Sequence, residues 1–259
     1  KGGPQAPVKK LEAVRQFARY QLQFDPRTEV PPNGILGSGY RRRVPHIYSD
    51  EEISALLKAA GAVDSRGSLR SRTYVTLFSL LLSTGMRVGE AARLTLADVD
   101  LERGVVHVNK TKFRKSRLVP LHPSATRALQ EYAAFRDRRQ PAQDGRTTFF
   151  RYDRRGFSLG RVGRTFAILR SKLGWGKASD ARSPRAYDIR HTFAVRRLLR
   201  WYVEGASVDE KISALSTYLG HVRVTDTYWY LTATPELLAV VGKRFEQYAD
   251  PRRQRRQVR

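Results

Sequence analysis

The chain has no cysteine, and this absence excludes disulfides, thiolate metal sites and cysteine nucleophiles together. It also has no apolar run that approaches the ~20 residues needed to cross a bilayer. Its first residues, Lys1 to Pro4, lack the apolar stretch of a signal peptide. We therefore expect a cytoplasmic protein without a membrane partner.

Metal-binding patterns are also scarce. The acidic residues are few and fall mostly at expected helix caps or surfaces, so they do not suggest the clustered carboxylates of two-metal catalysis. The histidines lack the spacing of a structural zinc site. We expect neither a metal nor another cofactor. The five histidines are His46, His107, His122, His191 and His221.

Basic residues are what the sequence has in excess. Its formal charge of +25 comes from 49 basic against 24 acidic residues, and 38 of the basic ones are arginine. Arginine can hydrogen-bond two phosphate oxygens at once. A broad basic face on a protein also releases counterions from a nucleic-acid duplex, which favours binding. On charge alone an RNA-binding protein, a ribosomal protein or an ordinary arginine-rich surface is the alternative. The charge thus indicates a polyanion without identifying which one.

Composition divides the chain into three parts. Residues 7–24 carry apolar side chains at helical spacing and predict one amphipathic helix with almost nothing before it to pack against. Residues 25–45 are rich in proline and glycine and contain Arg41, Arg42 and Arg43, which is typical of a basic linker. We predict a domain boundary near residue 44, a second domain over 45–250 and a basic tail over 251–259.

The second part is predicted to be mainly α-helical with a small antiparallel β-hairpin, an α+β fold. Ser49 and Glu52 form a capping-box pattern, and Gly85 permits the turn that ends a helix over 72–83. Residues 105–108 and 117–121 are β-rich and flank a polar, basic tip. Further helices are expected over 124–138, 159–173, 183–202, 209–219, 225–231 and 235–248.

Phosphodiester chemistry is suggested by the last third of the chain. Arg190 and His191 are followed 31 residues after Arg190 by His221, and nine residues later by Tyr230. A tyrosine can attack phosphorus without a metal if guanidinium and imidazole groups stabilise the added negative charge. The sequence therefore predicts a nucleophile and part of its cationic clamp.

These groups belong to a longer ordered set. Thr84-Gly85-Met86-Arg87-Val88-Gly89-Glu90 is followed by Lys112, Leu118-Val119-Pro120-Leu121, Arg190, Leu219-Gly220-His221 and Tyr230. In order and spacing this set resembles the tyrosine recombinase, or phage-integrase-like, family over about residues 45–250. The resemblance implies the family's catalytic-domain fold, and residues 1–44 resemble the end of its core-binding domain with the linker.

By resemblance Arg87 is the first arginine of the phosphate clamp, and Glu90 is the acidic residue that orients Arg87 or an imidazole. Glu90 is equally readable as a carboxylate on a helix surface. Lys112 matches the hairpin lysine that protonates the leaving 5′ oxygen. Lys110 and Lys115 on the same tip are alternatives, and these lysines with Arg114 can also bind backbone phosphate.

Arg190 is by resemblance the second clamp arginine, and Asp188 is expected to fix Arg190 or His191. Where the family usually has a histidine, this sequence has Tyr187. A phenol with a pKa of about 10 is a poor base, so Tyr187 is expected to hydrogen-bond the phosphate or a neighbour, and the base stays open. His191 is expected to pack in the core.

His221 follows Gly220 at a helix end, where the helix dipole favours its charged form, and is a candidate phosphate donor. The family spacing selects Tyr230 as nucleophile, with Tyr228 as the alternative. The alternative interpretation for each of these tyrosines is packing in the core, which is the usual role of an aromatic side chain.

The resemblance implies a mobile-element DNA recombinase that acts on double-stranded DNA through a 3′-phosphotyrosyl intermediate, without metal or ATP. It further implies nucleoid association, possible accessory recombinases, and four identical protomers joined through the helix over 235–248, which can alternatively dock on its own domain. The alternatives are a type IB topoisomerase and a basic DNA-binding protein with a decayed site.

Overall fold

The computed structural model describes residues 6–36, 44–65, 67–109, 116–141, 144–153, 157–176 and 183–232, without the side chains of Ala6, Lys9 and residues 230–232. The chain divides into two compact units, residues 1–44 and 45–259. In the described ranges, no helix is both long and apolar enough to span a membrane.

The first unit contains the predicted amphipathic helix, α1 (Ala6–Gln21). Arg15 is buried, pairs with Glu12, and donates to the carbonyls of Pro31 and Pro32 at 2.9 and 2.8 Å. These bonds fold the proline-rich segment back on the helix. Phe17 remains exposed.

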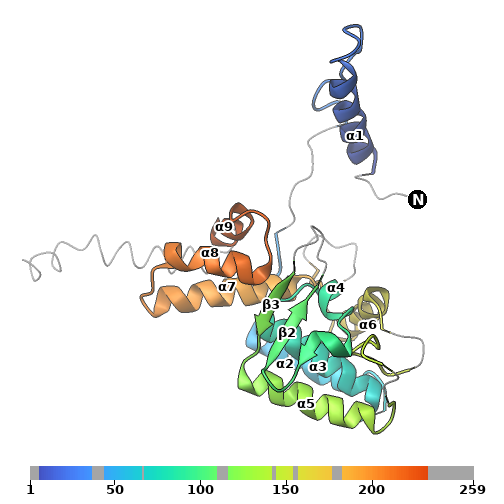
Figure 1. Ribbon diagram of the computed structural model, residues 1–259, viewed down its shortest axis with the longest axis vertical. Coiled ribbons are helices and arrows are strands. Elements are labelled where there is room, and N and C mark those ends of the chain that lie inside the picture. The colour runs from blue at the N-terminus through green and yellow to red at the C-terminus, as the bar shows by residue number, and fades with distance from the viewer. Residues whose placement is uncertain are drawn as a thin grey trace, which may run out of the picture. The chain divides into compact units, whose positions relative to one another are not determined.

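The second unit is mainly helical with one small sheet, as predicted (Figure 1). Its elements in chain order are α2 (Asp50–Gly61), α3 (Leu69–Thr84), the one-turn α4 (Val88–Ala91), the 3-10 turn η1 (Leu96–Asp98), β1 (Val99–Asp100), β2 (Val105–Val108), β3 (Arg117–Pro120), α5 (Pro123–Asp137), α6 (Leu159–Lys172), α7 (Asp188–Val203), α8 (Val208–Leu219) and α9 (Thr225–Thr232).

Local signals place several of these ends. Ser49 Oγ accepts from the Glu52 N–H, and the Glu52 carboxylate accepts from the Ser49 N–H, so the predicted capping box begins α2. Gly85 ends α3 with a φ of +62°, the left-handed conformation that glycine adopts without strain. Both predictions are confirmed.

The predicted hairpin is confirmed as well. β2 pairs antiparallel with β3, with Val105 opposite Pro120 and Val108 opposite Arg117. The two-residue β1 pairs with the other side of β2 and was not predicted, because it is too short to carry a periodic pattern. Val106 and Val119 face the core.

The helix expected over 183–202 begins five residues later, at Asp188. Pro184 lacks an N–H and disfavours a helical Ser183. The Asp188 carboxylate then accepts from the Arg185 backbone N–H at 2.9 Å, which forms a turn before the helix. The predicted start was therefore wrong.

Two apolar cores hold the unit together. The larger one joins α2, α3, α5, α6 and the sheet. The smaller one joins α7 and α8 through Val195, Leu198 and Leu215. α9 packs on both α7 and α8, and α8 also contacts β3. This packing brings the ends of α3, α8 and β3 together.

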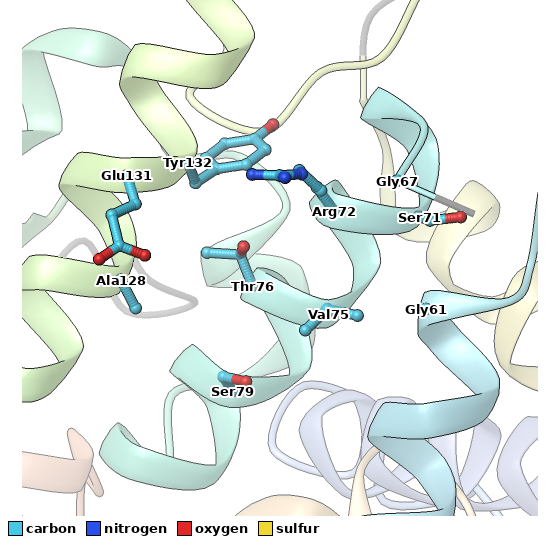
Figure 2. A pocket seen from close by; sticks show the side chains of 10 residues that line it. All are labelled: Gly61, Gly67, Ser71, Arg72, Val75, Thr76, Ser79, Ala128, Glu131 and Tyr132. Atoms are coloured by element: carbon cyan, nitrogen blue, oxygen red, sulfur yellow. The ribbon is translucent and has the colours of Figure 1, made fainter. Parts of the chain in front are cut away.

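A hollow of about 290 Å³ lies between α2, α3 and α5 (Figure 2). Val75 and Ser79 of α3 line it together with Ala128 of α5, and Gly61 at the end of α2 lies on the side of Val75. None of its lining residues belongs to the site predicted from the sequence.

Candidate active site

The site is built around the C-terminal end of α8. Gly220 stops this helix with a φ of +70°. The His221 N–H then turns back to the Ser216 carbonyl at 3.0 Å. The Gly220 N–H also donates to the Thr217 carbonyl at 2.9 Å, so this turn satisfies two of the last carbonyls and leaves those of residues 218–220 for other donors. The predicted His221 therefore lies at a helix end, as expected.

Arg190 reaches this helix end from α7. Its side chain is buried, with 2% of the residue exposed. Nη1 donates to the Gly85 carbonyl at 2.9 Å, and Nη2 donates to the Leu219 carbonyl at 2.6 Å. One guanidinium thus joins the end of α3 to the end of α8.

Arg87 reaches the same place from the start of α4. Nη2 donates to the Gly220 carbonyl at 3.0 Å, and Nη1 donates to Glu90 Oε1 at 2.8 Å. The Arg87 side chain is 33% exposed, so it remains open to a ligand from solvent. The two arginines identified by resemblance therefore bind adjacent carbonyls.

Glu90 is a buried carboxylate with 4% of its side chain exposed. It accepts from the Arg87 side chain and backbone, and from Arg117 Nη2 at 2.7 Å. Burial raises its pKa, but the hydrogen bonds and charge of Arg117, followed by those of Arg87, outweigh burial and lower the pKa to about 2. The expectation that Glu90 holds Arg87 is met in the geometry, and the surface alternative is wrong.

His221 is linked to α9. Its Nδ1 lies 2.7 Å from the hydroxyl of Thr227, which is fully buried on α9. This contact fixes the plane of the imidazole ring relative to the helix that carries Tyr230. It also joins the end of α8 to α9.

Tyr230 lies in the last turn of α9, and its side chain is outside the described part of the chain. The preceding residue, Trp229, places its ring edge-on to His191 with 5.4 Å between centroids. Tyr228 is exposed. The buried His191 therefore packs against the predicted nucleophile helix, which confirms its expected place in the core.

Tyr187 directly precedes α7 and is 46% exposed. Its ring also contacts His191 edge-on, at 4.9 Å between centroids. Asp188 was expected to fix Arg190 or His191. Its carboxylate instead accepts from the Arg185 side chain at 2.6 and 3.1 Å, because the turn before α7 brings Arg185 alongside it.

Several predicted residues lie outside the described parts of the chain. They are the DNA-binding candidates Arg41, Arg42 and Arg43, the hairpin-tip residues Lys110, Lys112, Arg114 and Lys115, and the predicted helix over 235–248. Among the residues the structure does describe, no three His, Cys, Asp or Glu side chains are placed to hold a metal ion.

Arg117 is a site neighbour that the sequence did not single out as functional. In the sequence it is only the first residue of the β-rich run 117–121. Its main partners, Glu90 and the Tyr218 carbonyl, lie 27 and 101 positions away in the chain. No local pattern links residues that far apart.

Comparison with known proteins decides the family. The model of the phage integrase family matches residues 47–236. The chain belongs to the phage integrase family. It is a site-specific DNA recombinase of the tyrosine type.

Proteins of similar sequence support the same family assignment. A Sinorhizobium fredii protein named as an integrase/recombinase, y4rB, is 42% identical over 242 residues, which cover 92% of this chain and 77% of the relative. The tyrosine recombinase XerC of Chlamydia trachomatis is 28% identical over 229 residues, covering 88% of this chain and 67% of the relative.

Solved structures share the fold of this recombinase. XerA recombinase matches with a TM-score of 0.58 at 24% identity, covering 94% of this chain and 77% of that one. The Tn1549 transposon integrase, in complex with transposon right end DNA, matches with a TM-score of 0.64 at 19% identity, covering 92% and 78%. The predicted catalytic-domain fold is confirmed.

Proposed function

We propose that this recombinase cuts and rejoins double-stranded DNA of a mobile element through a 3′-phosphotyrosyl intermediate. One observation carries the proposal. Arg87, Arg190 and His221 converge on the end of α8, immediately before the helix that carries Tyr230. Fixed cations beside a tyrosine suit phosphoryl transfer, since they stabilise charge that develops on phosphorus.

In the proposed reaction the Tyr230 hydroxyl gives its proton to water, its oxygen forms a bond to phosphorus, and the bond from phosphorus to the 5′ oxygen breaks. Lys112 gives its proton to the departing 5′ oxygen. Arg87 and Arg190 bind the non-bridging oxygens with His221 as a further donor. Tyr187, which is exposed directly before α7, donates a hydrogen bond to the phosphate or to an active-site neighbour.

The clamp is preorganised by the protein. A guanidinium carries five N–H donors. Arg87 uses two side-chain contacts, to Glu90 and the Gly220 carbonyl, to hold its position. The orientation of these groups therefore does not have to be established when DNA arrives, which is how electrostatic preorganisation lowers a barrier.

Rejoining reverses the first step. A 5′-hydroxyl from a partner duplex attacks the phosphotyrosine and releases Tyr230, so bond energy is conserved and we propose no role for ATP or metal. Four protomers would act on two duplexes through a Holliday junction, with 235–248 docking on a neighbouring protomer. Accessory recombinases are compatible with this scheme, and work on DNA would place the protein at the nucleoid.

The test is cleavage of nicked suicide DNA substrates carrying candidate element ends, in EDTA, resolved on a denaturing gel. Wild type is expected to give a covalent protein–DNA band. Tyr230→Phe is expected to give none. Tyr228→Phe is the matched control, because it removes the hydroxyl of an exposed tyrosine on the same helix, and it should keep the band.

Three other results of this assay would favour a different nucleophile or a different function. A band that survives in Tyr230→Phe and vanishes in Tyr228→Phe would reassign the nucleophile. Covalent cleavage with relaxation of supercoils but no strand exchange would favour a type IB topoisomerase. Tight DNA binding without a band on any substrate would contradict the enzyme proposal and favour a decayed site, for which Tyr187 is the supporting substitution.

A further inference from the structure

Arg117 occupies an unusual position for a residue at the start of a strand. Its side chain is 10% exposed, although it begins β3 beside the basic hairpin tip. Nε donates to the Tyr218 carbonyl at 2.8 Å, while Nη1 and Nη2 donate to the two oxygens of Glu90 at 3.2 and 2.7 Å. All three nitrogens of the guanidinium are therefore used within the protein.

The Tyr218 contact completes a series at the end of α8. Three successive carbonyls each accept from a different arginine: Tyr218 from Arg117, Leu219 from Arg190, and Gly220 from Arg87. The last carbonyls of a helix lack partners within the helix and carry partial negative charge. The arginines come from β3, α7 and the start of α4, so this helix end joins three elements.

Glu90 links two members of the series. Its carboxylate lies between Arg117 and Arg87 and binds both guanidiniums. A buried carboxylate needs such partners, because removal from water disfavours its charge. Loss of Arg117 would leave Glu90 with Arg87 alone, and Arg87 would then move to compensate.

We propose that Arg117 is a positioning residue for the strand-cleavage reaction. Through Glu90 it fixes the guanidinium of Arg87, and through the Tyr218 carbonyl it fixes the helix end that presents His221. This inference rests on the proposed function, which assigns Arg87 and His221 to the phosphate. Arg117 itself acts without touching DNA, since its donors are already directed inward.

Only arginine can make this set of contacts. Its planar fork donates in parallel to both oxygens of a carboxylate while Nε points to a third acceptor. Lysine keeps the charge but has one nitrogen on a flexible stem, so it cannot bind Glu90 bidentately and Tyr218 as well. The fit is also close, because a Cβ added at Gly220 would lie 2.8 Å from Arg117 Nη1.

The experiment is a double-mutant cycle of Arg117→Lys and Glu90→Gln. Single-turnover cleavage of a suicide substrate and DNA affinity at several salt concentrations are measured for wild type, both single variants and the double variant. Arg103→Lys is the matched control, because Arg103 pairs with Asp100 on the surface and its side chain is 85% exposed. Circular dichroism confirms that each variant is folded.

We expect Arg117→Lys to slow cleavage by up to about 100-fold, which is the cost of a misplacement of about 1 Å. DNA affinity and its salt dependence should stay within about twofold of wild type, as should cleavage by Arg103→Lys. The double variant should cleave at about the rate of the slower single variant, since residues that act as one unit are not additive.

A pH profile separates positioning from general stabilisation. In Arg117→Lys the paired hydrogen bonds to Glu90 are lost while the positive charge remains, so the burial of Glu90 is opposed less strongly and the carboxyl takes up a proton at higher pH. The rate of Arg117→Lys relative to wild type should therefore fall as the pH is lowered. In the Glu90→Gln background the Arg117→Lys substitution should have no such pH-dependent effect.

Three results would overturn the inference. They are a wild-type cleavage rate in Arg117→Lys, independent multiplication of the two effects in the double variant, and a salt slope of DNA binding reduced by about one in the charge-removing variant Arg117→Gln, which would mark a direct phosphate contact. If Arg117→Lys does not fold, a wild-type rate in Glu90→Gln would refute it equally. Failure of wild type to cleave would instead count against the proposed function.

Discussion

Substitution of Gly85 by alanine should destabilise the catalytic unit more than its small size suggests. Gly85 ends α3 with a φ of +62°, and its carbonyl accepts from Arg190. An added Cβ would lie against Cδ1 of Phe193, 2.8 Å from Cγ of that ring and 3.1 Å from Cδ2 of Leu219. Phe193 is on α7 and Leu219 is on α8, so the methyl group would separate the helices that form the site.

Two costs add at this position. A left-handed conformation costs an alanine roughly 1–2 kcal/mol. Forcing a methyl group into a close-packed contact costs about 1–3 kcal/mol more. Together they predict a loss of about 2–5 kcal/mol in the free energy of unfolding.

Urea unfolding followed by far-ultraviolet circular dichroism measures this loss, and two glycines supply the controls. Gly174 has a φ of +69° but nothing within 4 Å of an added Cβ, so Gly174→Ala isolates the backbone cost and should lose about 1–2 kcal/mol. Gly163 lies inside α6 with open space around it, so Gly163→Ala should gain about 0.4–1 kcal/mol.

The comparison between variants decides the matter. If Gly85→Ala unfolds at the same urea concentration as Gly174→Ala, the close approach of α7 and α8 to Gly85 contributes nothing and the reasoning fails. A larger loss accompanied by slower DNA cleavage would agree with displacement of Arg190 from the Gly85 carbonyl.

Two further changes test other contacts of the site. The folded pKa of Glu90 is lowered to about 2 from an ordinary 4.5, so it contributes about 3 kcal/mol of stability above pH 4.5 that is lost as the pH falls toward 2. Urea midpoints should therefore fall more between pH 5 and pH 2.5 in wild type than in Glu90→Gln, and parallel curves would contradict the assigned pKa. Thr227→Val removes the hydroxyl that contacts His221. It should lower the free energy of unfolding by about 1 kcal/mol in urea and slow single-turnover cleavage about tenfold. An unchanged cleavage rate would mean that this contact does not orient the imidazole.

Short-range rules predicted much of the fold. The capping box of Ser49 and Glu52 and the glycine turn at Gly85 depend on residues within a few positions, so the sequence displays them directly. The hairpin of β2 and β3 followed from two β-rich runs beside a polar segment. The start of α7 was misplaced because the competing turn of Arg185 and Asp188 has no periodic signal.

The candidate site came from family resemblance rather than from local physics. Arg87 and the Gly220 carbonyl lie 133 positions apart, and Arg190 and Gly85 lie 105 apart. Periodicity predicts which residues share a helix face, but it does not predict which helix ends meet. Arg117 therefore went unnoticed, since its partners are determined only by the tertiary fold.

The acceptors at the end of α8 are main-chain atoms, and this has a consequence for how the recombinase tolerates mutation. A carbonyl is present whatever side chain its residue carries, so changes at Tyr218 or Leu219 cannot delete the groups that receive Arg117 and Arg190. Such changes act through core packing and through the path of the backbone. The donors are side-chain groups, so a single substitution at any of the three arginines removes one of them. Random mutagenesis of this helix end should therefore give active variants at 218 and 219 wherever the new side chain still fits the core, and few at the three arginines.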